Sequence, residues 1–185
     1  MAASQLATAS DVVTFWREAG PEAWFKKDEA FDARIRERFL PTYEAAADGK
    51  LSSWEAHAEG ALALLILLDQ FPRNMFRGQA RMFETDPMAR AIAAGALVRG
   101  FDAEAPQDMR SFFYLPFEHS ESLKDQERSV ALFKATGDAE LLKWAEIHAD
   151  IIRRFGRFPH RNAVLGRATT SDERAFLDDE ASFKG

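Results

Sequence analysis

The 185-residue sequence has no cysteine, only two tyrosines and no apolar run long enough to cross a membrane. The lack of cysteine excludes disulfides, thiolate nucleophiles and cysteine-ligated zinc or iron–sulfur centres. The longest apolar run, 61–68, is far shorter than the roughly 18–20 residues that span a bilayer. Residues 1–10 lack the basic and apolar segments of a secretory signal. We therefore predict a cytoplasmic protein with no membrane partner.

The composition that is present is typical of a globular protein with a bulky apolar core. Hydrophobic residues make up 46% of the chain and include 16 phenylalanines, so the core has few hydroxyls to satisfy. Apolar residues recur at helical spacing almost everywhere, whereas strand-like alternation is absent. We predict an all-α fold of antiparallel helical hairpins, forming a single domain over 1–185 in which residues 1–10 are a loose tail.

Prolines, glycines and capping residues divide the chain into successive helices. Pro41 should kink or divide the second helix, and Pro72 should end the third. Ser52 and Glu55 form a capping box for the third helix, and Ser171 caps the last. The predicted helices cover about 11–19, 28–47, 53–70, 86–100, 107–113, 123–135, 138–155, 160–165 and 172–179.

The arginines are concentrated in two segments, which the net charge of −6 conceals. Residues 70–83 contain three arginines and no acid, and residues 151–171 contain five arginines and no acid. Local basic patches on an acidic chain favour a specific anionic partner over a polyanion. The acidic balance argues against a general nucleic-acid binder.

The first arginine segment offers a site for an anion. Arg73 and Arg77 can fork around a carboxylate or phosphate, because a guanidinium presents paired donors. Asp69 can orient Arg73. The alternative interpretation is a helix terminator in which Asp69 and the arginines pair with each other and Asn74 caps the next turn.

The segment 112–121 places an acid beside an imidazole. Glu118 and His119 can act as an acid–base pair if the carboxylate fixes the tautomer of the imidazole. Adjacent residues do not point the same way, so the two side chains need not touch. The alternative is a helix start, in which Ser120 or Ser122 caps the helix that follows.

The second arginine segment interleaves arginine with phenylalanine over 153–167. Arg157 and Arg161 can bind phosphates while the neighbouring rings stack, as in nucleotide sites. The equally weighted alternative is that these cations favour the helix C-terminus while Phe155 and Phe158 enter the core. The sequence Phe-Pro-Arg-Asn at 71–74 is echoed by Phe-Pro-His-Arg-Asn at 158–162.

The sequence contains no recognised metal-ligand motif and none of the common glycine-rich nucleotide-binding or hydrolase motifs. His119, His148 and His160, with Glu118 or Glu146, have no metal-ligand spacing. No P-loop, dinucleotide-binding glycine motif or serine-hydrolase elbow is present. We predict no metal and no cofactor.

Four motifs resemble a known family. The segments 69–74, 115–121, 126–129 and 154–162 look like the bacterial domain-of-unknown-function family nine hundred and twenty-four. The likeness covers about 12–177, nearly the whole chain. The resemblance implies an all-α fold similar to tetratricopeptide-repeat proteins, an α-α superhelix, and it implies no established activity.

Three functional hypotheses follow. The first is a binding module in which the four arginines at 73, 77, 157 and 161 line one groove that holds an acidic peptide or a small anionic molecule, or a module that binds a protein partner. The second is an enzyme in which His119 or His160 is the general acid or base, Glu118 its partner, and the arginines hold an anionic substrate. The third is RNA binding through the Arg/Phe segment, and the sequence leaves the oligomeric state open. The ligand-binding residues expected for the first hypothesis are Asp69, Arg73, Asn74, Arg77, Arg157, Arg161 and Asn162.

Overall fold

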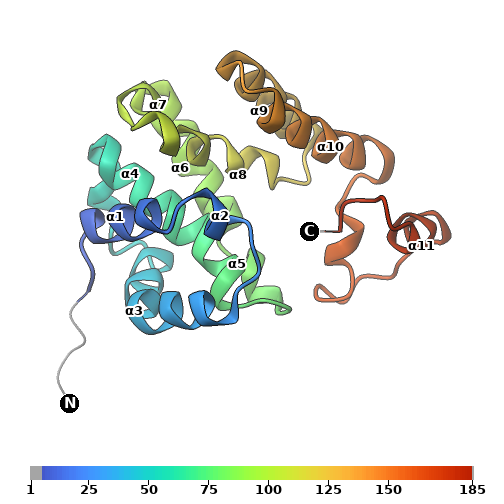
Figure 1. Cartoon of the computed structure of the whole chain (residues 1–185), viewed down its shortest axis with the longest axis horizontal. Coiled ribbons are helices and arrows are strands. Elements are labelled where there is room, and N and C mark those ends of the chain that lie inside the picture. Colours follow the sequence, from blue (N-terminus) through green and yellow to red (C-terminus); the bar gives the residue numbers. More distant parts are fainter. Residues whose placement is uncertain (1–5, 185) are drawn as a thin grey trace. The chain divides into compact units, whose positions relative to one another are not determined.

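The computed structural model describes residues 6–184, and every element within this range is helical (Figure 1). The predicted all-α fold is therefore confirmed. The chain divides into two compact units, residues 1–77 with 81–116 (unit 1) and residues 78–80 with 117–185 (unit 2). The single domain over 1–185 stays a prediction. None of the helices in the described range is both long and apolar enough to cross a membrane.

Unit 1 is built around a long central helical segment. Helix α1 packs on α4, α3 packs on α5, and α4 packs on α6. Phenylalanine and tryptophan rings from α1, α3 and the central segment stack or meet edge to face, which agrees with the bulky core expected from the composition. The elements are α1 (Ala9–Ala19), α2 (Pro21–Trp24), α3 (Glu29–Ala47), the 3₁₀ turn η1 (Ser52–Ala56), α4 (Ala58–Leu65), the π turn η2 (Ile66–Gln70), α5 (Phe71–Met75), the 3₁₀ turn η3 (Ala80–Phe83), α6 (Asp86–Val98), α7 (Phe101–Glu104) and the 3₁₀ turn η4 (Gln107–Phe113).

The central segment continues through Pro72, so the prediction that this proline ends the helix is wrong. Every residue from 60 to 72 is buried, as expected for a helix that is apolar all round. The π turn lets the Phe71 N–H donate to the Ile66 carbonyl, five residues earlier. Pro72 has no N–H for the Leu68 carbonyl, which instead accepts a hydrogen bond from Thr85 Oγ1 at 2.6 Å.

The start of α1 also differs from the sequence prediction, which began this helix at about residue 11. Thr8 caps α1, and Asp11 completes a capping box with Thr8, so this helix starts at Ala9. From the sequence alone we expected Ser10 to be this cap. The Ala7 N–H donates to Thr42 Oγ1 at 2.9 Å, so the chain is already held before the helix. Residues 1–5 of the predicted tail lie outside the described residues.

Two predictions about helix interiors and caps are also corrected. Pro41 does not divide α3, which is continuous over Glu29–Ala47. Ser52 and Glu55 form the 3₁₀ turn η1 and do not cap a long helix, because α4 begins six residues after Ser52.

Unit 2 consists of a helical hairpin followed by a loop and a short helix. Helices α9 (Leu123–Thr136) and α10 (Ala139–Phe155) pack together (Figure 1). They are joined by Gly137, at φ 76°, and by Asp138, which caps α10. The predicted hairpin is therefore present for this pair. The 3₁₀ turn η5 (Pro159–Arg161) packs on α11 (Ser171–Asp178).

The cap of α11 lies one residue before the predicted one. Thr170 is the N-cap, and Glu173 completes the capping box that Ser171 lacks. Phe158 and Phe176 are buried beside the end of α10, so the alternative in which Phe158 enters the core describes this ring correctly.

Candidate functional site

The first arginine loop lies in unit 1, and its arginines bind carboxylates of the same unit. Arg73 donates to both oxygens of Asp86 at 3.0 and 3.1 Å. Its Nη1 also lies 3.5 Å from the Asp69 carboxylate, so Asp69 and Arg73 do pair. The pairing of Asp69 with Arg73 is the one part of the helix-terminator interpretation that these contacts match, since the helix itself continues through Pro72. Asp86 is a partner that the sequence did not indicate.

A second carboxylate, Asp32 in the first turn of α3, binds the rest of this loop. Arg77 donates to its two oxygens at 2.5 and 3.0 Å, and Asn74 Nδ2 donates at 2.7 Å. Asn74 therefore donates to a side chain and does not cap the next turn. Asp32 is only 7% exposed, and the sequence did not single it out because it precedes Asn74 by 42 positions.

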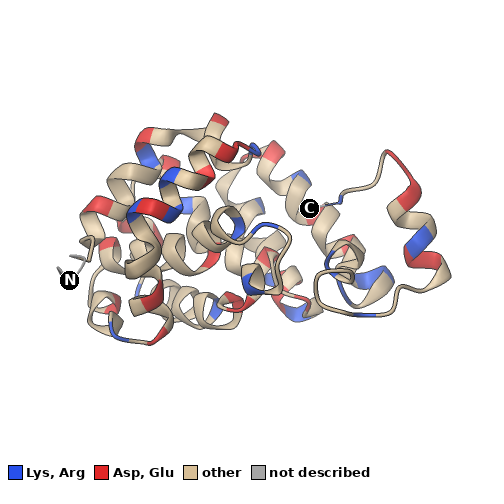
Figure 2. Ribbon diagram, turned by 90° about the horizontal axis from the view of Figure 1, so that it is seen from below, with Lys and Arg blue, Asp and Glu red and all other residues tan. Residues whose placement is uncertain are grey.

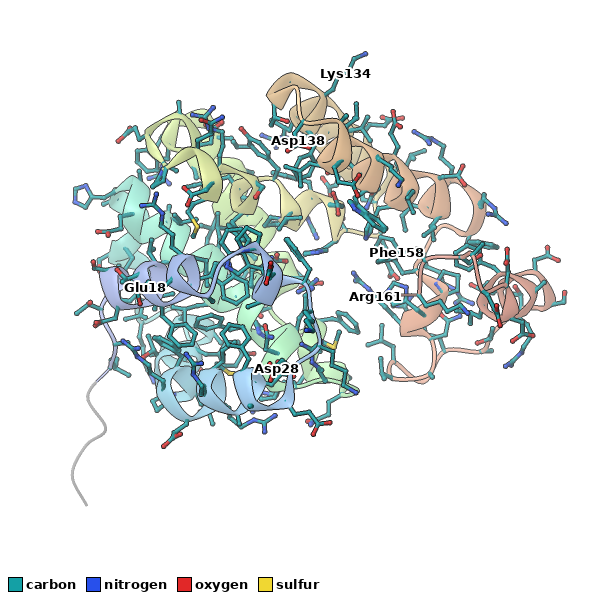
Figure 3. All side chains as sticks on the ribbon, viewed as in Figure 1. Glu18, Asp28, Lys134, Asp138, Phe158 and Arg161 are labelled. Atoms are coloured by element: carbon teal, nitrogen blue, oxygen red, sulfur yellow. The ribbon has the colours of Figure 1, made fainter. Side chains whose placement is uncertain are left out.

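In unit 2 the structure brings two of the predicted motifs together. Arg161 donates to the His119 carbonyl at 2.9 Å, which joins η5 to the turn after α8 (Leu115–Glu118). Glu121 accepts from the Phe158 N–H at 2.9 Å and from Arg167 Nη1 at 3.0 Å to each oxygen. We call these contacting segments, 117–121 and 157–173, the loop cluster. Figure 3 labels Phe158 and Arg161 within it.

Glu173 holds the other side of the loop cluster. Arg157 donates to its two oxygens at 2.6 and 2.9 Å, and Asn162 Nδ2 donates at 3.2 Å. The hydrogen bonds from Arg157, together with that from the Thr170 N–H, lower the pKa of Glu173 from 4.5 to about 2. The Glu173 side chain is 3% exposed, so this carboxylate is a structural part of the loop.

The structure shows a carboxylate–imidazole pair that the sequence analysis did not propose, and the pairing of Glu118 with His119 or His160 stays a prediction. Glu118 Oε1 lies 3.4 Å from Nδ1 of His148, on α10, whereas the sequence suggested His119 or His160 as its partner. His148 Nδ1 is also 2.8 Å from the Trp144 carbonyl, which accepts only from a protonated nitrogen. The hydrogen of a neutral His148 is therefore on Nδ1, and Nε2 is the basic nitrogen.

Aromatic rings surround the imidazoles of unit 2. Phe158 lies 5.6 Å from His148 and 5.5 Å from His160, between ring centroids. Phe183 lies 4.4 Å from His148 and 5.7 Å from His160. His119, Glu118 and His160 are thus parts of one unit. His148, the imidazole that the sequence analysis left out of the acid–base pair, lies beside Glu118 and packs on Phe158 and Phe183.

No group of three or more histidine, aspartate or glutamate side chains within residues 6–184 is placed to hold a metal ion. The residues that sequence reasoning missed are mostly partners of the predicted arginines. Only Glu173 had a local signal, because it stands three positions after Thr170 as in a capping box.

The four arginines that were predicted to bind an anion are divided between the two units. Arg73 and Arg77 lie in unit 1, and Arg157 and Arg161 lie in unit 2. The groove that all four would share stays a prediction.

Comparison with known proteins identifies the family. The model of a family described as "Bacterial protein of unknown function (DUF924)" matches residues 12–181. The chain belongs to this family, which confirms the resemblance seen in its motifs. A solved structure of a protein of unknown function from Agrobacterium tumefaciens is similar, with 50% sequence identity and a TM-score of 0.89. The match covers 92% of this chain and 96% of that one. No curated protein sequence matches the chain.

Proposed function

We propose that this member of the family is a binding module whose loop cluster in unit 2 recognises a small anionic molecule or an acidic peptide. The observation that carries the proposal is the set of donors around Glu121. One backbone N–H, from Phe158, and the guanidinium of Arg167 converge on one carboxylate at 2.9–3.0 Å. Such a combination of backbone amide and guanidinium is a common way for proteins to bind an anion.

The Glu121–Arg167 pair is more exposed to solvent than the carboxylate of the Arg157–Glu173 pair, which is structural. The side chains of Glu121 and Arg167 are 27% and 23% exposed, whereas that of Glu173 is 3% exposed. A ligand carboxylate or phosphate can therefore replace Glu121 without opening the core, and it cannot replace Glu173. Arg161, which donates to the His119 carbonyl, lies in the same loop cluster.

The helical hairpin in unit 2 is a second feature that supports a binding role. The helical hairpin of α9 and α10 is the kind of unit from which tetratricopeptide-like superhelices are built. That superhelix, with a concave face for a partner, is part of the same proposal.

The test is calorimetry and thermal shift of the full chain with inorganic phosphate, succinate and a short acidic peptide. A ligand at a hundred times its Kd should raise the free energy of unfolding by about 2.7 kcal/mol, or the melting temperature by roughly 5–11 °C. Arg167→Gln should abolish this shift. Glu121→Ala should strengthen binding of the small anions, because the competing carboxylate is removed.

Arg153→Gln is the matched control, since Arg153 is an exposed arginine of the same unit. It should bind like the wild type. No stabilisation by any of the three probes in wild type and Glu121→Ala would refute the proposal, as would equal binding by the folded Arg167→Gln variant.

A second candidate function is acid–base catalysis on an anionic substrate, favoured by the Glu118–His148 pair. A carboxylate beside Nδ1–H leaves Nε2 as the base, which is the arrangement of catalytic imidazoles in hydrolases. The test is a screen of phosphate and carboxylate esters. Turnover that falls about 100-fold in both Glu118→Gln and His148→Gln would support catalysis. Turnover that is unchanged in both variants would contradict it.

A further inference from the structure

We propose that a pocket in unit 1 is a binding site for a linear aliphatic amine that carries two or more ammonium groups. The pocket has a volume of about 400 Å³ and lies among α1, α4 and the end of α7. This volume is in the range of small-molecule sites. The site is separate from the loop cluster, and its ligand would have the opposite charge. The lining residues are Val13, Thr14, Arg17, Glu18, Ala58, Glu59, Leu62, Glu104, Ala105 and Pro106.

Half of the lining is apolar. Val13 and Leu62 are 8% and 1% exposed, so they belong to the core and form a rigid wall. Ala58, Ala105 and Pro106 add small apolar surfaces from α4 and from the turn after α7. Small side chains on a surface pocket leave room for a methylene chain, whose burial is favourable by about 0.8 kcal/mol per CH₂.

The charged part of the lining is acidic. Glu18, Glu59 and Glu104 are all exposed, and none of them makes a hydrogen bond or ion pair with another residue in the range 6–184. Figure 3 labels Glu18 on α1. Three carboxylates from three different helices thus surround one apolar pocket, and no basic side chain of the described chain neutralises them.

The one basic residue of the lining does not change this balance. Arg17 Nε donates to Asp108 at 2.8 Å, so its charge is already matched by a carboxylate outside the lining. Red and blue segments occur together along the helices of the chain in Figure 2, whereas this lining holds three acids and a single paired arginine. Such a concave acidic site attracts cations and repels the anions expected at the loop cluster.

The apolar wall and the three carboxylates together favour one class of ligand. An apolar wall excludes a hydrated metal ion as the preferred ligand, and three dispersed carboxylates favour several positive charges over one. A chain of methylenes with ammonium groups at its ends satisfies both features. Because the carboxylates are exposed, each ion pair contributes only about 0.2–1 kcal/mol, and the affinity should fall as salt is added.

The experiment is calorimetric titration of the full chain with spermidine and with 1,6-diaminohexane at low salt. Adipate, which has a similar length and two negative charges, is the negative control ligand. The double variant Glu59→Gln/Glu104→Gln should bind the amines about tenfold more weakly, since two ion pairs are lost. Ala105→Phe, which fills the pocket and leaves its charge unchanged, should also lose binding.

Glu22→Gln/Glu37→Gln is the matched control, because both glutamates are exposed in unit 1, lie outside the pocket and change the net charge by the same amount. Its affinity should stay within about twofold of the wild type. The proposal is wrong if neither amine binds, or if the control pair weakens binding as much as the pocket pair. Binding of a lysine-rich peptide but not of the amines would also overturn it.

Discussion

At the scale of single residues, the two arginine loops use the same arrangement of side chains. Asn74 and Arg77 donate to Asp32, and Asn162 and Arg157 donate to Glu173. Each carboxylate stands in the first turn of a helix, α3 or α11. Of the residues echoed between 71–74 and 158–162, only the asparagines therefore make the same contact, because Arg77 and Arg157 lie outside these segments.

Glu173→Gln should destabilise the protein by about 2 kcal/mol, because a neutral amide cannot serve both donors of Arg157 as a carboxylate does. The measurement is urea unfolding at neutral pH. Glu180→Gln is the control, since Glu180 is exposed and should change the free energy of unfolding by less than about 0.5 kcal/mol. Equal stabilities of the two variants would show that the Glu173 network contributes nothing.

At the scale of elements, the central segment of unit 1 departs from regular helix structure at two places, η2 with Pro72 and the glycine at position 60. The π turn η2 and Pro72 leave the Leu68 carbonyl to a side chain on another segment, Thr85. Gly60, near the start of α4, allows the backbone of Trp54 to pass where a side chain would stand. Both departures are tolerated because the segment is buried over its length and cannot shift.

Thr85→Val should destabilise unit 1 by about 1–2 kcal/mol, since it leaves the buried Leu68 carbonyl without its donor. Thr85→Ser keeps the hydroxyl and should retain most of the stability. Chemical denaturation of the two variants measures the difference. If valine is tolerated as well as serine, then the carbonyl does not need Thr85.

Gly60→Ala should destabilise by about 1–3 kcal/mol, because the new Cβ would lie 2.1 Å from the Trp54 carbonyl oxygen. Gly95→Ala is the control within another helix, where the nearest atom is 3.5 Å away on the flexible Arg99 side chain. That change should stabilise by about 0.5–1 kcal/mol. Melting temperatures that move in the same direction for both variants would disprove this account.

At the scale of the whole molecule, acidic groups with lowered pKa values couple stability to pH. Hydrogen bonds with Thr8 lower the pKa of Asp11, and the Phe31 N–H lowers that of Asp28. The pKa of Glu173 is lowered to about 2, chiefly by Arg157. A carboxyl whose pKa is lower in the folded state adds stability above its unfolded pKa, and this stability is lost as the pH falls.

The free energy of unfolding should therefore decline as the pH is lowered from about 4.5 towards 2, the interval between the unfolded and folded pKa values of Glu173. Glu173→Gln lacks this carboxyl, so its deficit relative to the wild type should shrink across the same interval. Urea midpoints measured at a series of pH values test the prediction. A deficit that stays constant with pH would mean that the charge of Glu173 is not what stabilises the loop.

Much of the helical structure was determined by the sequence alone. The predicted ranges 28–47, 123–135 and 138–155 agree to within one residue with α3, α9 and α10, because periodicity and capping signals act within one or two turns of the chain. The motifs were also sufficient to identify the family. The errors at Pro41, Pro72 and Ser171 arose where packing or a neighbouring cap prevailed over a local preference.

Only the tertiary structure decided the partners of the arginines and of the predicted acid. Asp32 and Asn74 are 42 positions apart, Glu121 and Arg167 are 46 apart, and His148 reaches Glu118 from a different helix. A charged residue carries no information about which of many opposite charges it will meet, since that choice follows from how the helices pack. The sequence therefore determined which residues carry charge, and the fold determined which carboxylates the arginines bind and which line an open pocket.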